Sequence, residues 1–594
     1  MPMPSAMERA MQLYQAQDFA SARILLEAER DRAALPLPGL LILAQCQARL
    51  GDNASAATLY RIAADAMEGV PDKIALLSLA LTLLRTAGRF DEAHDVARLL
   101  LGLDPRHQEA AYVFRHTLRQ RLDIEEQRSS NAAILAGMRR NDPFYFGIES
   151  PLNHIAWCAD EALNSRVTFV EGAAAFTPED RHRRRHRPHV YSQRPRVGYL
   201  SSDFSDCHAT MQLLQGVLDF HDPQAIDFTL FCHTSPAMIA ADGDFRKRHA
   251  ERIVPLGHLD TETACAAIRA RQIDILVDLK GHTLDGRLDI VNRGPAPIQV
   301  AYLGFPGSQT GVDCDYIVTD AIVTPPESRP WYHEKFCLLP DCYQPNDNLR
   351  RSLPPPLSRK ALGLPEGRFI FAAMNAIRKI TPDCFDLWME ILRRTGDSVL
   401  WMLSGGALAD DHFRRAVAAA GIDPARVIFA AKTGYLDHLA RLPAADLGLD
   451  SFPYNGHTTT SEQLWVGLPL VTKRGTHFAS RVSESLLHAI DLPEMVADND
   501  AAFVDLAVRL SQEPETLAAL RQKLIKNRRI APLFDTERYT RHLEKAFVMM
   551  IERARQGLEP DHFAVPPLPP RSSPFAIGPS SLGCGASYAP VRPD

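Results

Sequence analysis

Apolar side chains recur at helical spacing along the first 120 residues, and the pattern repeats itself. The segments "YQAQDFASARILLEA", "ARLGDNASAATLYRIA" and "RTAGRFDEAHDVARLLL" superpose on Ala22, Ala56 and Ala93, so the period is 34 and then 37 residues. Each segment places a polar turn between two apolar-periodic stretches, which is typical of a helix pair. Periods of this length indicate a stack of similar helical units.

These units resemble the tetratricopeptide repeat, in which a small alanine lets the paired helices approach closely. We therefore expect tetratricopeptide-like helical repeats over residues 1–120. The alternative is a generic helical bundle. Repeats of this kind bind peptides or proteins along a concave face and carry no chemistry themselves.

The pattern changes after residue 193, where short β-rich runs alternate with helical stretches. The first series comprises "RVGYLSSDF", "DFTLFCHT", "IDILVDLKGHT", "IQVAYLGFPG", "DYIVTDAIV" and "KFCLLP"; the second comprises "RFIFAAMN", "SVLWMLSG", "RVIFAAKTG", "DLGLDSF" and "LPLVTKRG". Such alternation predicts α/β domains with mainly parallel sheets covered by helices on both faces. Ligands of these folds bind at the carboxyl ends of the strands.

The remaining segments complete the expected organisation. We expect a helical segment and basic linker over residues 121–193, a first Rossmann-like domain over 194–345, a linker over 346–366, a second Rossmann-like domain with a C-terminal helix over 367–556, and a disordered tail over 557–594. The basic run "RHRRRHRPHVYSQRPR", from Arg181 to Arg196, has no apolar periodicity. A nucleic-acid patch is one interpretation of this run, and we favour a solvated loop or linker.

Composition excludes several classes of protein. The net charge of −6 over 594 residues argues against a general nucleic-acid binder, and 46% hydrophobic residues are typical of a soluble globular chain. The N-terminal sequence lacks the basic and apolar regions of a signal peptide, and no apolar run is long enough to span a membrane. The ten cysteines include no C-x-x-C pair. We expect a cytoplasmic protein with reduced thiols.

The stretch "NGHTTTSEQLWVGLPLVT" places candidate chemistry at the start of a helix. Asn455-Gly456 predicts a tight turn, and three threonines, Thr458 to Thr460, fall where backbone N–H groups are free. A helix N-terminus with hydroxyl donors forms an anion site, and His457 adds another donor. The alternative is a capping box between Thr459 and Glu462, which would need no ligand.

A second loop of the same half repeats this arrangement. In "FAAMNAIRKITPDCFDLWMEIL", Asn375 and Lys379 lie between a strand and a helix, where the lysine could reach a phosphate as a point charge. A lysine that faces water at a helix entrance is the alternative. His438 follows the strand "RVIFAA" and, taken alone, is an ordinary helix histidine.

The first half offers weaker signals. His208 lies in a strand-to-helix loop, where it could accept a proton or orient an acceptor; a surface histidine is the alternative. The Gly-rich stretch "LGFPGSQTG", which includes Pro306 and Gly307, could let backbone approach a sugar or phosphate. Asp-x-Asp pairs, which hold a metal in some glycosyltransferases, occur at 242/244, 313/315 and 498/500, away from these motifs. We predict no required metal and no cofactor.

Together these blocks resemble the O-GlcNAc transferases. The segments "RVGYLSSDFSDCHAT", "ILVDLKGHT", "GPAPIQVAYLGFPGSQTG…DYIVTD", "MNAIRKITPDCFDLWMEIL" and "NGHTTTSEQLWVGLPLVT…ASRV" occur in the order found in that family, over residues 194–555. The chain is similar to bacterial members, with helical repeats ahead of the catalytic region. The resemblance implies a GT-B pair of Rossmann-like domains and inverting, metal-independent transfer of N-acetylglucosamine from UDP-GlcNAc to Ser or Thr hydroxyls of a protein or peptide acceptor.

The resemblance also implies roles for individual residues. His457, Thr458 and Thr459 would bind the diphosphate, Lys379 the leaving phosphate, Glu462 the ribose and His438 the uracil, while Thr433, Gly434 and Tyr435 frame the base. Pro306, Gly307 and Ala376 would complete the donor site. His208 would act as a base or orient the acceptor.

Several positions depart from the family pattern. Ala376 replaces a glutamine, Tyr435 replaces a lysine near the uridine, and Cys207 is an extra residue before His208. The link between the two halves is short and Pro-rich, whereas animal enzymes have a large insert. The alternatives are a related glucosyltransferase that acts on Asn, and a non-catalytic repeat scaffold that binds nucleotide.

Overall fold

The computed structural model describes residues 5–31, 34–168, 176–206, 208–569, 571 and 573–575. Two compact units divide the chain, the first of residues 1–121 and 134–149 and the second of residues 122–133 and 150–594. Among the described residues, no helix is long and apolar enough to cross a membrane.

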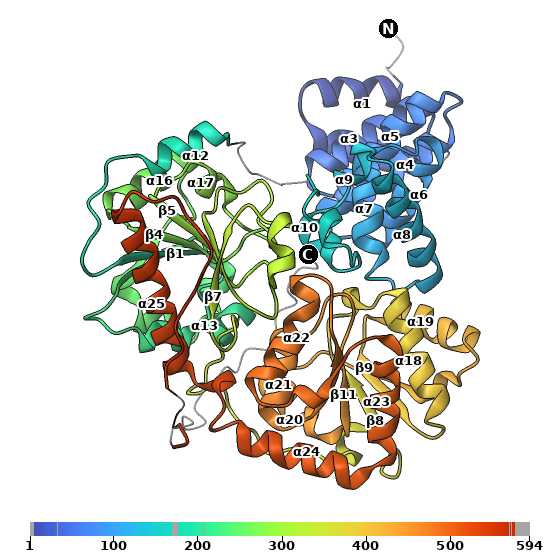
Figure 1. The fold of residues 1–594 in the computed structure, drawn as a ribbon. Coiled ribbons are helices and arrows are strands. Elements are labelled where there is room, and N and C mark those ends of the chain that lie inside the picture. Colours follow the sequence, from blue (N-terminus) through green and yellow to red (C-terminus); the bar gives the residue numbers. More distant parts are fainter. Residues whose placement is uncertain are drawn as a thin grey trace. The chain divides into compact units, whose positions relative to one another are not determined.

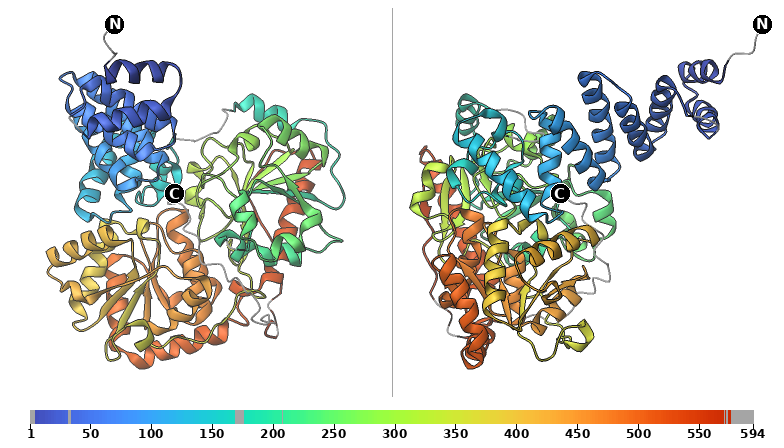
Figure 2. Two further views of the ribbon diagram at one scale, coloured as in Figure 1. Left: turned by 180° about the vertical axis from the view of Figure 1, so that it is seen from behind. Right: turned by 90° about the vertical axis from the view of Figure 1, so that its right-hand side faces the viewer.

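The first unit is built from antiparallel helix pairs, each packed on its neighbours in the chain (Figures 1 and 2). Its helices are α1 (Ala6–Gln15), α2 (Phe19–Arg30), α3 (Leu37–Arg49), α4 (Asn53–Asp65), α5 (Val70–Thr86), α6 (Phe90–Leu103), α7 (Gln108–Leu118) and α9 (Pro143–Phe146), and the residues of α8 (Ile124–Arg139) are assigned in part to each unit. Ala22, Ala56 and Ala93 are all fully buried at the helix contacts. The repeat prediction is therefore confirmed, including the reason for a small residue at these positions.

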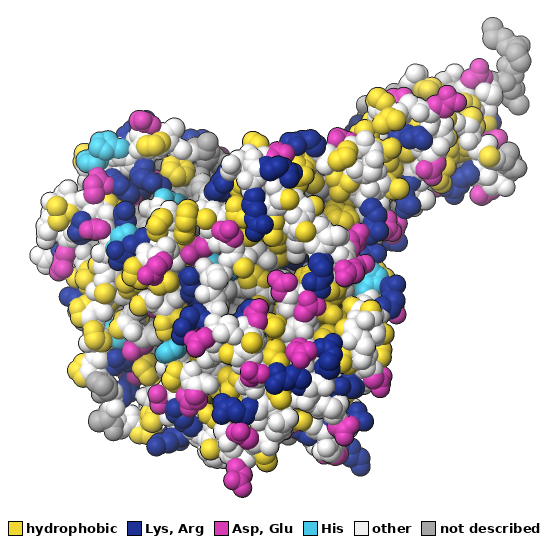
Figure 3. Space-filling model, turned by 45° about the vertical axis from the view of Figure 1, so that its right-hand side comes forward, with side chains coloured by type: hydrophobic (Ala, Val, Ile, Leu, Met, Phe, Trp, Pro, Cys, Tyr) yellow, Lys and Arg dark blue, Asp and Glu magenta, His cyan; other side chains and the backbone are white. Residues whose placement is uncertain are grey.

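The repeat unit keeps apolar side chains on its surface. Ile24, Ile62 and Leu99, on α2, α4 and α6, are 63%, 47% and 51% exposed. Figure 3 shows such side chains scattered among charged ones over the repeat helices. Scattered single apolar residues are ordinary on a protein surface.

The second unit contains two parallel sheets. The first has the strand order β14-β7-β6-β5-β4-β1-β2-β3 and the second β10-β9-β8-β11-β12-β13. The first sheet comprises β1 (Arg196–Ser201), β2 (Asp227–Cys232), β3 (Ile253–Pro255), β4 (Ile275–Asp278), β5 (Ile298–Ala301), β6 (Tyr316–Asp320), β7 (Lys335–Leu339) and β14 (Phe563–Ala564). The second comprises β8 (Ile370–Ala373), β9 (Val399–Leu403), β10 (Val427–Ala430), β11 (Leu447–Leu449), β12 (Leu470–Lys473) and β13 (Val496–Ala497).

Helices cover both sheets (Figure 1). Those around the first sheet are α10 (Pro151–Ile155), α11 (Glu161–Asn164), α12 (Pro178–Arg185), α13 (Ala209–Phe220), α14 (Pro236–Ala240), α15 (Phe245–Arg248), α16 (Thr261–Ala270) and α17 (Leu288–Asn292). The second sheet is accompanied by α18 (Pro382–Arg394), α19 (Ala407–Ala419), α20 (Tyr435–Arg441), α21 (Thr458–Val466), α22 (Phe478–Ala489), α23 (Asp500–Gln512) and α24 (Pro514–Asn527), followed by α25 (Thr536–Arg555). All eleven runs quoted as strands from the sequence contain a strand, and the short β3, β13 and β14 were not anticipated.

The C-terminal helix packs on the first sheet although it follows the second in sequence. Leu543, Phe547 and Met550 of α25 share an apolar cluster with Val197 and Tyr199 of β1. Figure 1 shows this helix, in red, running beside the strands of the first sheet. α25 follows the second sheet in the chain and yet contributes to the core of the first sheet.

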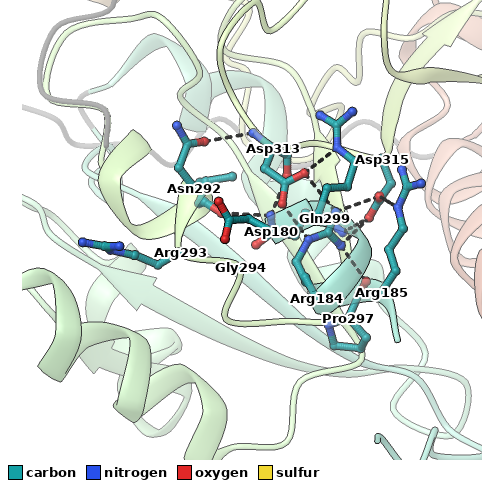
Figure 4. A network of polar contacts seen from close by, with 12 residues as sticks. Asp180, Arg184, Arg185, Asn292, Arg293, Gly294, Pro297, Gln299, Asp313 and Asp315 are labelled. Carbon is teal, nitrogen blue, oxygen red and sulfur yellow. Dashed lines mark hydrogen bonds and ion pairs between the residues drawn. The ribbon is translucent and has the colours of Figure 1, made fainter. Parts of the chain in front are cut away.

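The prediction of a solvated linker is wrong for the first part of the basic run, whereas residues 186–195 form no helix or strand and are mostly exposed. The first part forms α12, and Arg184 is only 2% exposed. The Arg184 guanidinium pairs with Asp313 through Nε at 2.8 Å and with Asp315 through Nη1 at 2.8 Å (Figure 4). Arg181 also pairs with Asp313. This Asp-x-Asp pair therefore balances the charge of the basic helix.

The tail prediction is wrong at its start. β14 pairs in parallel with β7, and Val565 is 2% exposed against the first sheet's core. Residues 576–594 lie outside the described residues, as does Cys207.

Candidate active site

Asp450 organises the loop between β11 and α21. This residue is fully buried, and its carboxylate accepts hydrogen bonds from the Gly456 N–H at 2.7 Å, the Ser451 N–H at 2.9 Å and the Thr472 hydroxyl at 2.7 Å. Asn375, from the loop after β8, donates its amide to Asp450 at 3.3 Å. Burial raises the pKa of Asp450, and these hydrogen bonds oppose that rise.

The N-terminus of α21 has no side-chain cap. His457 is the N-cap residue and makes no capping hydrogen bond, and the helix begins at Thr458. A capping box would require Thr459 at the N-cap position, so the ligand-free alternative raised by the sequence is wrong. The first N–H groups of the helix remain available for an anion.

Gly456 is required by close packing at this turn. A Cβ atom at this position would lie 2.4 Å from the Thr460 hydroxyl and 2.8 Å from the buried Asn375 Oδ1. The turn therefore brings the backbone of residues 455–458 against the loop that carries Asn375. Only glycine fits without displacing one of these side chains.

Lys379 approaches the same turn. Its ammonium group donates to the Asn455 carbonyl at 2.7 Å and lies 4.0 Å from the centroid of the Tyr454 ring. Burial lowers the pKa of Lys379 to about 7, with a further contribution from Arg378 and an opposing one from Asp450. An anion bound here would favour the charged ammonium. The structure thus brings Lys379 and the N-terminus of α21 together.

His457 differs in one respect from its expected role. Its Nε2 lies 3.2 Å from the Ala479 carbonyl, and its ring is 4.8 Å from that of Tyr454. Burial holds the pKa of His457 well below its usual value, so the neutral ring donates Nε2–H to that carbonyl. The imidazole therefore orients the turn, while Thr458 and Thr459 stay partly exposed beside it.

The residues expected at the base and ribose meet between α20 and α21, which pack against each other. His438 Nε2 lies 3.6 Å from the Glu462 carboxylate, and its Nδ1 accepts from Arg441 at 3.0 Å. Burial lowers the pKa of His438 to about 3 and raises that of Glu462 to about 7. Since the imidazole is neutral, this contact is a weak polar one and not a salt bridge.

The loop before α20 carries the other expected base-binding residues. The Thr433 hydroxyl donates to Asp437 at 3.4 Å, and Gly434 is the N-cap residue of α20, which begins at Tyr435. Thr433 and Tyr435 are partly exposed. Ala376 is exposed at the start of the turn that carries Lys379.

His208 belongs to a separate cluster at the end of β1. It is the N-cap residue of α13, its Nδ1 accepts the Thr210 N–H at 3.2 Å, and it lies 3.4 Å from Asp203. Asp203 also pairs with Lys280 at 2.6 Å. Burial alone would raise the pKa of Asp203, but the charge of Lys280 lowers it below its ordinary value. Asp203 and Lys280 were not predicted from the sequence; they come together because β1 and β4 are adjacent strands.

Pro306 and Gly307 follow β5 and line a pocket of about 300 Å³ of empty space. Tyr332 and two residues at the start of α22, His477 and Phe478, also line it. His477 is 3% exposed, and its Nε2 has no hydrogen-bond partner within the described part of the chain.

The sequence-predicted residues thus lie at the carboxyl ends of parallel strands in both sheets, where open α/β folds bind their ligands. Two such sheets, with an uncapped helix N-terminus beside a strand end of the second, are the architecture of a GT-B glycosyltransferase fold. Residues 177–352 and 350–543 match the model of glycosyl transferase family 41. The chain belongs to this family.

Individual relatives agree with the family match. A probable UDP-N-acetylglucosamine–peptide N-acetylglucosaminyltransferase of Arabidopsis thaliana is 35% identical over 383 residues, which cover 63% of this chain and 39% of the relative. The corresponding enzyme of Caenorhabditis elegans is 27% identical over 486 residues, covering 62% of this chain and 42% of the relative. The chain thus matches about two-fifths of the length of these curated relatives.

A solved structure is similar over most of the chain. The O-GlcNAc transferase of Thermobaculum terrenum, solved as a mutant, superposes with a TM-score of 0.60 and 25% identity. The match covers 93% of this chain and 98% of that structure. The similarity therefore extends beyond the two sheets.

Proposed function

We propose that the protein transfers N-acetylglucosamine from UDP-GlcNAc to a Ser or Thr hydroxyl of a protein acceptor, with inversion and without a metal. In this reaction the acceptor oxygen bonds to C1 of the sugar, the bond from C1 to the phosphate oxygen breaks, and UDP departs with the electron pair. The acceptor proton passes to solvent or to a base.

One observation carries the proposal: the uncapped N-terminus of α21 and the Lys379 ammonium converge on one turn. A departing diphosphate develops negative charge, which preorganised N–H groups and a lysine stabilise. The hydroxyls of Thr458 and Thr459 would add donors. Because these groups are cationic or neutral donors, they suit a diphosphate without an intervening metal.

The nucleoside would lie between α20 and α21. Glu462 would accept hydrogen bonds from the ribose hydroxyls, and His438 would pack on the uracil framed by residues 433–435. Pro306 and Gly307 would approach the sugar from the first sheet. A protein or peptide acceptor would be recognised in part by the helical repeats.

His208 would orient the acceptor hydroxyl. Because Nδ1 accepts the Thr210 N–H, the neutral ring carries its proton on Nε2. A protonated Nε2 donates a hydrogen bond and does not accept the acceptor's proton. This favours the orienting role over the general-base role.

Eight described cysteines are free and buried, which suits a protein that stays in the reducing cytoplasm. This location is part of the proposal.

Calorimetric titration with EDTA present tests the donor site. UDP and UDP-GlcNAc are expected to bind the wild-type protein, and Lys379→Ala is expected to weaken UDP binding by roughly 1.5–3 kcal/mol, as for a lost charged hydrogen bond. UDP-glucose in parallel tests the alternative donor. If the wild-type protein binds no UDP-sugar, the proposal fails. If it binds one, mass spectrometry of acceptor peptides tests whether Ser, Thr or Asn is modified.

A further inference from the structure

Arg351 is a buried cation in the connection between the two sheets. It is 3% exposed, and its Nη1 donates to the Ser461 hydroxyl of α21 at 3.1 Å. Its Nε and Nη2 are buried and have no hydrogen-bond partner in the described structure. No carboxylate of the described residues lies within ion-pair distance of it.

The position of Arg351 follows from how the connection binds α21. The Ser352 carbonyl accepts the indole N–H of the fully buried Trp465 at 3.0 Å. This hydrogen bond holds the connection along the helix, and Arg351 then reaches Ser461, one residue before Glu462. An uncompensated buried charge costs several kcal/mol, so a cation at this position requires a counter-charge nearby.

Glu462 directly follows Ser461, the residue to which Arg351 donates, and it carries the carboxyl group on which the Arg351 charge acts. Glu462 is 7% exposed, and burial raises its pKa to about 7, while Arg351 acts in the opposite direction. The neutral His438 on α20 faces Glu462, and its Nδ1 accepts a hydrogen bond from Arg441. Another cation near α21 is Arg528, the C-cap residue of α24, which donates to the Trp465 carbonyl.

We propose that Arg351 is a positioning residue of the nucleotide site, which holds Glu462 as a carboxylate so that it can accept the ribose hydroxyls. The inference rests on the proposed function and assigns the connecting segment a part in it. Hydrogen bonds to an ionised carboxylate are about twice as strong as those to a neutral acceptor. A neutral carboxyl group would instead present its own O–H to the diol.

The test is the pH dependence of UDP affinity, measured by calorimetry from pH 6 to 8.5. Five proteins are compared: wild type, Arg351→Gln, Arg351→Lys, Glu462→Gln and the double variant Arg351→Gln/Glu462→Gln. Lys379 and the UDP phosphates titrate in all five, so the ratio of each affinity to that of Glu462→Gln isolates Glu462. Thermal melts establish that each variant folds.

The expected result follows from the sign of the charge effect. In the wild type the affinity ratio falls as the pH drops through about 7, because Glu462 becomes protonated. Without Arg351 the same fall occurs about one pH unit higher, so affinity at pH 7 drops roughly fivefold and recovers toward pH 8.5. Arg351→Lys keeps the wild-type midpoint, and Arg351→Gln has no effect in the Glu462→Gln background.

This inference alone is overturned if the wild type binds UDP but Arg351→Gln lowers UDP affinity equally at every pH. The same holds if Arg351→Gln still lowers UDP affinity in the Glu462→Gln background. A wild type that binds no UDP at any pH would overturn the proposed function with it. If Arg351→Gln does not fold, Ser461→Ala removes the hydroxyl that anchors Nη1. The pH midpoint of the affinity ratio is expected to rise by less than one unit in Ser461→Ala. An unchanged pH midpoint would contradict the role of Arg351.

Discussion

The Asp450 carboxylate accepts the Gly456 N–H at 2.7 Å and thereby closes the turn that leads into α21. Asp450 follows β11, and Gly456 lies two residues before the helix. The same carboxylate also accepts from Thr472, directly on the neighbouring strand β12. One buried charge therefore holds the candidate diphosphate turn in place from the sheet beneath it.

Asp450→Asn is expected to lower the free energy of unfolding by about 1–3 kcal/mol, because the amide leaves buried donors without an acceptor. UDP affinity should fall as well, since the turn loosens. Asp410→Asn is the matched control: Asp410 accepts from Ser404 and Gly405 after β9, away from the turn. Chemical denaturation and UDP titration on both variants measure the two effects, and equal UDP affinities would refute a positional role for Asp450.

Gly456→Ala should abolish detectable UDP binding or weaken it more than tenfold. The added Cβ would lie 2.4 Å from the Thr460 hydroxyl, so the start of α21 must move. Gly367→Ala provides the control. Gly367 lies just before β8, and a Cβ atom there would meet nothing within 4 Å. Titration of both variants with UDP should separate them; retained binding by Gly456→Ala would show that the turn tolerates displacement.

Because the pKa of Lys379 is lowered, UDP binding is expected to be accompanied by proton uptake. In the free protein that pKa is about 7, so at pH 8 most of the protein carries a neutral amine. A bound diphosphate favours the ammonium form, so close to one proton should be taken up at pH 8 and almost none from this group at pH 6. Calorimetry in buffers of different ionisation enthalpy measures this number. Lys379→Met should lose the uptake, and persistence in that variant would assign it to another group.

Arg184→Ala is expected to destabilise the protein by about 3–5 kcal/mol, because it leaves the carboxylates of Asp313 and Asp315 buried without their main partner. Arg183→Ala tests a neighbouring arginine whose side chain is 75% exposed and which, within the described residues, pairs with Asp180. Its effect should stay within about 0.5 kcal/mol. Urea denaturation compares them, and similar midpoints would mean that solvent compensates the buried carboxylates.

His208→Asn should reduce kcat by roughly 10²-fold and leave UDP affinity unchanged, because His208 lies in the first sheet's cluster with Asp203. Asparagine retains a donor, so His208→Ala should be slower than His208→Asn if the residue orients the acceptor. Initial rates with an acceptor peptide measure this order. Equal rates for the two variants would favour proton acceptance over orientation.

Local pattern was sufficient for the elements and for the residues at their ends. The repeat alanines, the strands and the turn before α21 all depend on neighbours within a few residues, so periodicity and residue type indicate them. Lys379 and His457 could be predicted for the same reason, because each follows a strand and parallel strands place their carboxyl ends at one edge. The capping box at Thr459 failed because the helix begins two residues earlier than the box requires, with His457 at the N-cap position.

What the sequence determined by itself was therefore the succession of helical repeats and two parallel sheets, with candidate donor-binding residues at strand ends. Only the tertiary structure decided how charges meet: Arg184 with Asp313 and Asp315, Asp203 with Lys280, and Arg351 beside Ser461 and Glu462. These partners lie between 77 and 131 residues apart. From the sequence alone a charged side chain is predicted to be exposed to solvent. Its burial becomes favourable only when the fold supplies a counter-charge or a ligand.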